Sequence, residues 1–432
     1  MTVYIDPSLT SDGSGSFANP RNTVAAFNNL TGDQSGEAIL IKRGTTTDDR
    51  IINTSAFNFR LGSYGESGHP LPIIPAYAQD YSVYLSGGND ISVFSLDLID
   101  AIRTGLLIQG TTCNNLRISN LTIRNVNGTG AQDAINIKPA NLSTGVYIAG
   151  NRTLHCVGNS IEVGKLTAPV IVQNYSDDCF QCIELWETVT DALVEANKFI
   201  NSKGRAVWLA NGGSAGQGQS NEIYTGNIIR NNQFLDVISG PEVQANIGAG
   251  LITATGNQFY HNTLVIRNGG SGFKLDAGSS HTVQNNIFYQ RADVDQIGGP
   301  SDMVRIALGA EVGSSIDGNY YYSADPRDAL SDGKFKFNGT TQQNINNWIA
   351  NGPAGIDKNC SGGTDPGFVD LANNDVRLTA TSPCLYDNQL PTGAVVSGIS
   401  TEDYNRDPRY TDNDQGALQY KRLPETIGSI SL

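Results

Sequence analysis

Residues 159–164 read NSIEVG and residues 181–186 read QCIELW, and these two stretches decide the fold. Each has apolar residues at its third and fifth positions and a glutamate between them. Successive side chains of a β-strand point to opposite faces, so the alternation predicts strands with one buried and one outward face. Glu162 and Glu184 are therefore predicted to point outward.

The same six-residue motif recurs along the middle of the chain with the same alternation. The further copies are DAINIK (133–138), RAVWLA (205–210), PEVQAN (241–246), SGFKLD (271–276) and DMVRIA (302–307). Stacking the copies brings their fourth positions into one outward column. In chain order that column reads Asn136, Glu162, Glu184, Trp208, Gln244, Lys274 and Arg305. This column is the surface on which we look for function.

A second repeat indicates how the strands are stacked. An asparagine begins another short strand in each unit, at Asn120, Asn151, Asn174, Asn197, Asn232, Asn257, Asn286 and Asn319. Repeats of roughly 20 to 50 residues are typical of solenoids. With short alternating strands, they predict an all-β parallel β-helix. Asparagine tolerates left-handed turns and can hydrogen-bond in a stacked ladder, so we interpret this series as structural.

Three regions are predicted. Residues 1–45 form an N-terminal cap with a short helix, residues 46–324 form the β-helix, and residues 325–432 form a C-terminal capping region. The stretch NINNWIANG (344–352) is predicted to be a helix in that last region. Caps are expected because a solenoid otherwise exposes its apolar core at both ends.

Composition excludes several classes of partner. A formal net charge of −14 argues against a nucleic-acid partner, since such binding depends on Lys and Arg neutralising phosphates. No apolar stretch approaches the roughly 20 residues that span a bilayer, so no membrane partner is expected. The N-terminus lacks a basic and apolar signal peptide. The protein is therefore expected either to have had a signal trimmed or to leave the cell by lysis, as a virion component does.

Three stretches resemble the pectate-lyase-like superfamily of right-handed parallel β-helices. They are the opening YIDPSLTSDGSGSFANPRNTVAAF (4–27), the coil LGSYGESGHPLPII (61–74), and the tail TDPGFVDLANNDVRLTATSPC (364–384) with RDPRYTDNDQGALQY (406–420). The resemblance implies a right-handed helix that binds and degrades polysaccharide outside the cell or on a virion. With the absent signal peptide, it implies a phage tailspike-type depolymerase of bacterial surface polysaccharide, with a homotrimer and other tail proteins as its assembly partners.

Hydrolysis of a glycosidic bond needs one protonated and one ionised carboxyl group. Glu162 and Glu184 meet this need, because neighbouring strands hold their backbones about 4.8 Å apart. Their like charges should also raise the pKa of one partner. Asp178, at the turn before the second strand, is a candidate third acid. Trp208 and Trp186 are candidates for stacking on sugar rings, and Asn136 and Gln244 for further substrate contacts.

Elimination by a polysaccharide lyase is the alternative chemistry. It needs a base, and Ca²⁺ or an arginine to neutralise a uronate carboxylate. Lys274 with Arg305, or Lys203 with Arg205, are candidates for the base. A lyase would use calcium, with Asp177, Asp178 and Glu184 as its candidate ligands, whereas hydrolysis requires no cofactor. Lys274 lies three strands, roughly 14 Å, from Glu184, so we place the two groups in separate centres and interpret Lys274 and Arg305 as substrate contacts.

Hydrolysis is favoured slightly over elimination. A non-catalytic glycan-binding or structural tail protein is the competing class, in which the same column is a binding groove.

Overall fold

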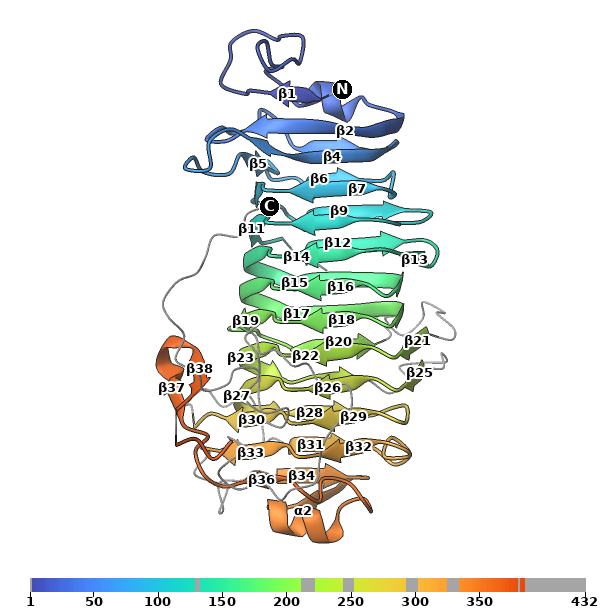
Figure 1. Ribbon diagram of the computed structural model, residues 1–432, viewed down its shortest axis with the longest axis vertical. Coiled ribbons are helices and arrows are strands. Elements are labelled where there is room, and N and C mark those ends of the chain that lie inside the picture. The colour runs from blue at the N-terminus through green and yellow to red at the C-terminus, as the bar shows by residue number, and fades with distance from the viewer. Residues whose placement is uncertain are drawn as a thin grey trace.

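The computed structural model describes residues 2–128, 133–210, 222–243, 252–292, 302–324, 334–379 and 381–384. These residues form a tall stack of coils, with the chain's start at one end and the helix α2 at the other (Figure 1). In the described ranges the coils pair through a 12-stranded and a 24-stranded sheet, and the pairing between coils is parallel and in register. The predicted parallel β-helix is confirmed.

The 12-stranded sheet forms one face of the stack. Its strands, in order, are β1 (Val3–Ile5), β2 (Gly32–Lys42), β4 (Ala56–Tyr64), β7 (Ile91–Phe94), β10 (Arg117–Ser119), β14 (Tyr147–Ala149), β16 (Val170–Val172), β18 (Leu193–Glu195), β22 (Ile228–Arg230), β26 (Gln258–Tyr260), β29 (Thr282–Gln284) and β32 (Ser315–Asp317).

The 24-stranded sheet folds into two rows, because β15 (Arg152–Thr167) and β17 (Tyr175–Thr190) run through both. The first row also holds β5 (Ile73–Pro75), β8 (Asp97–Ile99), β11 (Thr122–Val126), β19 (Lys198–Ile200), β23 (Gln233–Ser239), β27 (Thr263–Ser271), β30 (Ile287–Gln290), β33 (Tyr320–Ser323) and β36 (Ser361–Gly362).

The second row carries the six-residue motif. It holds β3 (Ile51–Asn53), β6 (Tyr81–Leu85), β9 (Thr104–Gly110), β12 (Asp133–Pro139), β20 (Val207–Ala210), β24 (Glu242–Val243), β28 (Phe273–Leu275), β31 (Asp302–Ile306), β34 (Lys334–Phe337) and the antiparallel β35 (Thr340–Gln342). Short strands β13 (Ser143–Thr144), β21 (Glu222–Thr225) and β25 (Ile252–Thr255) extend the sheet at the next corner.

One continuous apolar core fills the stack, as the alternation predicted. Ile161, Val163, Ile183 and Leu185 are fully buried and belong to a single cluster that runs along the stack. The predicted helix near residue 344 is confirmed as α2 (Ile345–Asn351). Its Trp348 is fully buried and stacks on Phe335 with ring centroids 5.3 Å apart, so α2 covers the end of the core.

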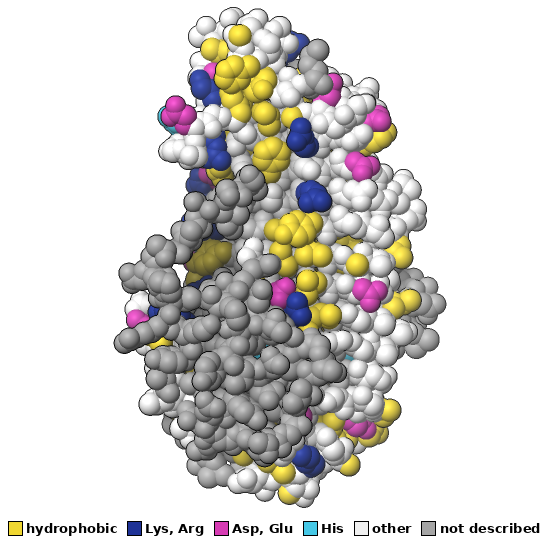
Figure 2. All heavy atoms as spheres, in the orientation of Figure 1, with side chains coloured by type: hydrophobic (Ala, Val, Ile, Leu, Met, Phe, Trp, Pro, Cys, Tyr) yellow, Lys and Arg dark blue, Asp and Glu magenta, His cyan; other side chains and the backbone are white. Residues whose placement is uncertain are grey.

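The remaining elements are short. Helix α1 (Ala25–Asn28) is a single turn, η1 (Leu371–Asn373) is a 3-10 turn, and β37 (Phe368–Asp370) pairs antiparallel with β38 (Asp375–Leu378) beside the stack (Figure 1). No helix within the described ranges is long and apolar enough to cross a membrane. On one side of the molecule, hydrophobic side chains gather with Lys and Arg in a band that follows the long axis (Figure 2).

An asparagine ladder holds the corner that precedes the first row. Each side-chain amide donates to the side-chain oxygen of the asparagine in the next coil, at 2.9 to 3.0 Å, through Asn151, Asn174, Asn197, Asn232, Asn262, Asn286 and Asn319. The ladder ends on the buried Asp357, whose carboxylate lies 3.5 Å from the Asn319 amide and accepts a hydrogen bond from Trp348. Burial raises the pKa of Asp357 to about 6.

Two members of the predicted series differ from this ladder. Asn262 takes the place that was predicted for Asn257, which instead accepts from Asn227 at 2.9 Å in a second, shorter ladder at another corner. Asn120 adopts a left-handed backbone, and the neighbouring Leu121 N–H donates to Asn151. Because a coil can carry asparagines at two corners, the sequence period alone does not assign each one to its ladder.

Replacing a ladder asparagine should destabilise the fold. The Asn174 side chain accepts from Asn151 and donates to the carbonyl of Ile148 and to Asn197. Asn174→Ala leaves several of these buried groups unpaired, at a cost of about 1–3 kcal/mol each. The midpoint of denaturant unfolding should fall clearly. Asn141→Ala, at an exposed position, is the control and should change stability by less than about 0.5 kcal/mol. Equal midpoints for the two variants would contradict a structural ladder.

Candidate active site

The motif strands present two outward columns, not one. Strict alternation breaks at the corner between the two rows, because the second and third motif positions both point inward; Ser160 and Ile161 are each fully buried. The first and fourth positions then both point outward, on either side of the bend. The first-position column runs through Asp133, Asn159, Gln181, Arg205, Ser239 and Ser271. Side chains of the two columns converge on one another.

The fourth-position column is confirmed with one correction. The strand pairing stacks seven residues directly above one another. They are Asn136, Glu162, Glu184, Trp208, Glu242, Lys274 and Arg305. Glu242 therefore stands where Gln244 was predicted, and Gln244 itself lies outside the described residues. A two-residue slip keeps every side chain on the same face, so alternation could not detect it.

One amide joins the two predicted catalytic glutamates. The Asn159 side chain donates to Glu162 Oε2 at 3.1 Å and to Glu184 Oε2 at 2.7 Å. Both glutamates are largely buried, at 8% and 6% exposure. Because one nitrogen reaches both, these two oxygens are closer than the roughly 6.5 Å lower limit of an inverting carboxyl pair. Gln181 supports the arrangement by donating to Asn159 Oδ1 at 2.9 Å.

A third acid, Asp133, belongs to the same network although the sequence reading did not include it. It is 2% exposed and accepts hydrogen bonds from the Asn136 amide at 2.7 Å and from the Asn159 backbone N–H at 3.1 Å. The Asn136 amide also donates to Glu162 at 3.1 Å. Asp133 is the first residue of the motif DAINIK. Strict alternation assigns that position to the core, so nothing in the sequence indicates that its side chain points outward.

The carboxyl groups are protonated unequally. Burial, reinforced by the negative charge of Glu162, raises the pKa of Glu184 to about 8. Burial and the same charge also raise the pKa of Asp133 well above its ordinary value. At neutral pH, Glu184 thus keeps its proton beside a charged Glu162. A proton donor next to an ionised carboxylate is the pairing that glycosidic cleavage requires.

The basic end of the column is tied to this centre. The Arg205 guanidinium lies 4.1 Å from the ring centroid of Trp208, and it binds Glu242 at 2.6 Å and Gln181 Oε1 at 3.4 Å. Lys274 reaches Glu242 at 3.5 Å. The strand register confirms that Glu184 and Lys274 are three strands apart. Polar contacts through the first-position column nevertheless join the predicted centre at Glu184 to the predicted centre at Lys274.

Trp186 lies outside the column, two residues past Glu184 on β17, whereas Arg305 is the last residue of the predicted column. Trp186 is half-buried on the strand of Glu184, and the Lys138 amine lies 4.0 Å from its ring centroid. Arg305 makes a two-point ion pair with Asp276, with both nitrogen–oxygen distances at 3.0 Å. The charge of Arg305 is thus paired with Asp276.

Asp178 forms a different cluster. Its carboxylate binds Lys203 at 2.6 Å and His155 at 3.1 Å. Burial raises its pKa, but these hydrogen bonds and charges outweigh burial, so the pKa of Asp178 is lowered. Among the described contacts none joins Asp178 to Glu184. Asp178 therefore stays ionised and serves here as an anchor for Lys203.

The three predicted calcium ligands do not form a group. Asp177 accepts from Asn201 at 2.8 Å and Asp178 is occupied by its two cations, whereas Glu184 lies past the corner in the network with Asn159. Within the described ranges, no three His, Cys, Asp or Glu side chains are arranged to hold a metal ion. The bend between Asp178 and Glu184 accounts for their separation.

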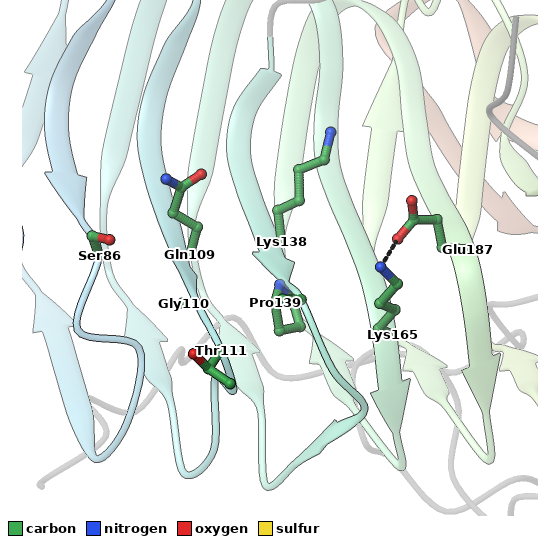
Figure 3. A pocket seen from close by; sticks show the side chains of 9 residues that line it. Ser86, Gln109, Gly110, Thr111, Lys138, Pro139, Lys165 and Glu187 are labelled. Atoms are coloured by element: carbon green, nitrogen blue, oxygen red, sulfur yellow. Dashed lines mark ion pairs between the residues drawn. The ribbon is translucent and has the colours of Figure 1, made fainter. Parts of the chain in front are cut away.

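A groove lies farther along the motif strands, where Lys165 and Glu187 follow Glu162 and Glu184 by three positions. It has a volume of about 490 Å³ and is lined by Ser86, Gln109, Gly110, Thr111, Lys138, Pro139, Ala140, Lys165 and Glu187. Figure 3 shows Lys165 and Glu187 facing each other across neighbouring coils, and they form an ion pair at 2.8 Å. The site therefore combines a buried acid pair with an open polar groove.

No protein-family model and no curated protein matches the sequence. Similar solved structures include the GH136 lacto-N-biosidase from Eubacterium ramulus, at 16% identity and a TM-score of 0.45 over 75% of this chain and 67% of that one. XylC in complex with xylose gives 9% identity and a TM-score of 0.48 over 79% and 86%. Pectate lyase Pel9A gives 15% identity and a TM-score of 0.34 over 97% and 96%.

At such identities and TM-scores the similarities carry no argument about chemistry. The reaction proposed below is therefore inferred from the side chains of this protein alone.

Stability should depend on the proton of Glu184. Its folded pKa of about 8 exceeds the ordinary value of 4.5, so the folded state holds the proton more tightly than the unfolded chain. The stability that this proton contributes is complete below pH 4.5 and is lost as the pH rises through 8. Glu184→Gln, which stays uncharged, should raise the Tm at pH 8.5 and leave the Tm at pH 4.5 nearly unchanged.

Thermal unfolding measured across this pH range provides the check. Glu66→Gln, at an exposed loop position, is the control and should follow the wild type. A Glu184→Gln variant that loses Tm at high pH as steeply as the wild type would contradict the raised pKa.

Proposed function

We propose that this protein hydrolyses glycosidic bonds of a polysaccharide, with Glu184 as the general acid and Glu162 as the ionised carboxylate. The observation that carries the proposal is the Asn159 amide, which holds both carboxyl groups at 3.1 and 2.7 Å while burial raises the pKa of Glu184. A matched acid and base at this separation are the two groups that hydrolysis needs.

The geometry supports a double-displacement reaction. The Glu184 carboxyl donates its proton to the glycosidic oxygen, and the leaving sugar departs as an alcohol. The Glu162 carboxylate attacks the anomeric carbon and forms a covalent ester. Water then attacks that carbon and gives a proton to the Glu184 carboxylate, which releases the sugar and restores both groups.

The other members of the network position these two groups. Asn159 and Gln181 fix the distance between the carboxyl groups through consecutive hydrogen bonds. Asp133, whose pKa burial raises, accepts from Asn136 and orients it, and Asn136 in turn donates to Glu162. Arg205 lies on the Trp208 ring, where the pair provides a flat, charged surface for the sugar on the far side of Glu184.

A narrower setting is part of the proposal. Residues 4–27 resemble the start of many polysaccharide-degrading β-helices, and residues 364–384 with 406–420 resemble an ending common in secreted and phage-borne members. This resemblance supports a tailspike-type depolymerase that acts on bacterial surface polysaccharide, outside the cell or on a virion. Such a protein would assemble as a homotrimer with other tail proteins. A mass measurement of the protein in solution tests the trimer.

Substituting the acid pair should abolish cleavage. Glu184→Gln removes the carboxyl group that gives up and takes back a proton, and Glu162→Gln removes the negatively charged carboxylate. Each substitution should therefore reduce product formation by at least about 100-fold. A panel of bacterial and algal polysaccharides, assayed for new reducing ends, provides the measurement. Glu195→Gln is a matched control on the opposite sheet, where Glu195 pairs with Arg230, and it should retain activity.

Three outcomes of this assay oppose the proposal. Ultraviolet absorbance from unsaturated uronate ends would identify a lyase instead of a hydrolase. Binding of a polysaccharide by the wild type without any new ends would identify a glycan-binding protein. Full activity in Glu184→Gln would also exclude Glu184 as the acid.

The product should keep the anomeric configuration of the bond that is cleaved. The separation of Glu162 and Glu184 falls below that of an inverting pair, and two successive displacements restore the starting configuration. Proton NMR of the first product, recorded before it equilibrates in water, reads the configuration directly. An inverted first product would show that water attacks without a covalent intermediate.

A further inference from the structure

Lys138 stands at the junction of the acid pair and the groove. It lies two residues after Asn136 on β12, so both side chains leave the same face of the strand. Lys138 also lines the groove of about 490 Å³. Figure 3 shows its side chain extended away from the strand, whereas Lys165 in the neighbouring coil turns toward Glu187.

The amine of Lys138 is held in place by an aromatic ring. Its Nζ lies 4.0 Å from the ring centroid of Trp186, two coils away. Gly164 occupies the coil between them, and a Cβ there would lie 2.9 Å from the Trp186 carbonyl oxygen and 3.3 Å from its ring. The missing side chain lets the indole lie across this coil. Stacking of a cation on an indole restrains the lysine without neutralising it.

Lys138 differs from the other cations around the site in its partners. Arg205 and Lys274 both bind Glu242, and Lys165 binds Glu187. Lys138 is exposed and makes no ion pair with any residue that the structure describes. Its charge is thus available to a ligand, in a position where an anion would be close to Glu184.

A second polar group on β12 points to the same ligand. The Asn136 side-chain oxygen is buried and receives no hydrogen bond from the residues that the structure describes, while its amide nitrogen donates to Asp133 and Glu162. A buried acceptor without a donor is costly, and a sugar hydroxyl would supply one. Asn136 and Lys138 are separated by roughly 7 Å along the strand, which is comparable to the span of one substituted sugar ring.

We propose that Asn136, Lys138 and Trp186 form a subsite for a negatively charged sugar unit, so that the polysaccharide is acidic. The Asn136 side-chain oxygen accepts a hydrogen bond from a hydroxyl group of the sugar, and Lys138, held by Trp186, binds the carboxylate or sulfate of the sugar. The placement of this unit next to the cleaved bond rests on the proposed function. Binding itself requires no cleavage and can be measured separately.

The test is a binding measurement on the full-length chain carrying Glu184→Gln, which prevents turnover. The probes are galacturonan oligosaccharides, the same oligosaccharides with their carboxyl groups reduced to alcohols, sulfated chondroitin oligosaccharides, and an array of acidic and neutral bacterial glycans. Lys138→Met is compared with Lys203→Met, which removes the same charge at the Asp178 cluster outside the groove.

The parent protein should prefer acidic glycans to their neutral counterparts by at least 10-fold, and the preference should weaken with added salt. Lys138→Met should lose the preference while keeping its affinity for the neutral forms, and Lys203→Met should match the parent. Preference for the carboxylated or for the sulfated probes identifies the anion.

Either of two results would overturn the subsite. The first is that the parent protein binds acidic glycans no better than neutral ones, and the second is that Lys138→Met keeps the parent's preference for acidic glycans. These outcomes differ from failure of the proposed hydrolysis. An acidic preference that depends on Lys138, in a protein whose wild type cleaves nothing, would support the subsite and reject the enzyme.

Discussion

In-register parallel pairing between coils is the constraint on which this structure depends. It places the same motif position of each coil directly above that of the coil before, about 4.8 Å away. Apolar third and fifth positions then merge into one core. The same stacking forces Glu162 and Glu184 into neighbouring positions, where two ionised carboxylates would repel.

The site resolves this repulsion with hydrogen bonds and a retained proton. Asn159 donates to both carboxyl groups, and burial together with the Glu162 charge raises the pKa of Glu184. The asparagine ladder at the other corner uses the same stacking of amides, but there each amide meets another asparagine and the result is purely structural. One repeat geometry thus supplies both the scaffold and the unequal acid pair.

The parts of this structure that follow from alternation were predictable. The parallel β-helix, the buried motif positions, the outward Glu162 and Glu184, and the helix α2 all follow from periodicity or from local helix signals. Asp133, Asn159 and Gln181 could not be placed, since the bend that turns them outward breaks the two-residue period. Glu242 was missed because a two-residue slip preserves that period, and Asn262 because asparagines occur at two corners.

The central claim is that Glu184 holds a proton because it is buried beside the charge of Glu162. Carbon NMR of the glutamate carboxyl groups, recorded through a pH titration of the wild type and of Glu162→Gln, measures this directly. Glu184 should titrate near pH 8 in the wild type and at a lower pH in the variant, where the neighbouring charge is gone. Titration of Glu184 near its ordinary value of 4.5, or at the same pH in both proteins, would contradict the claim.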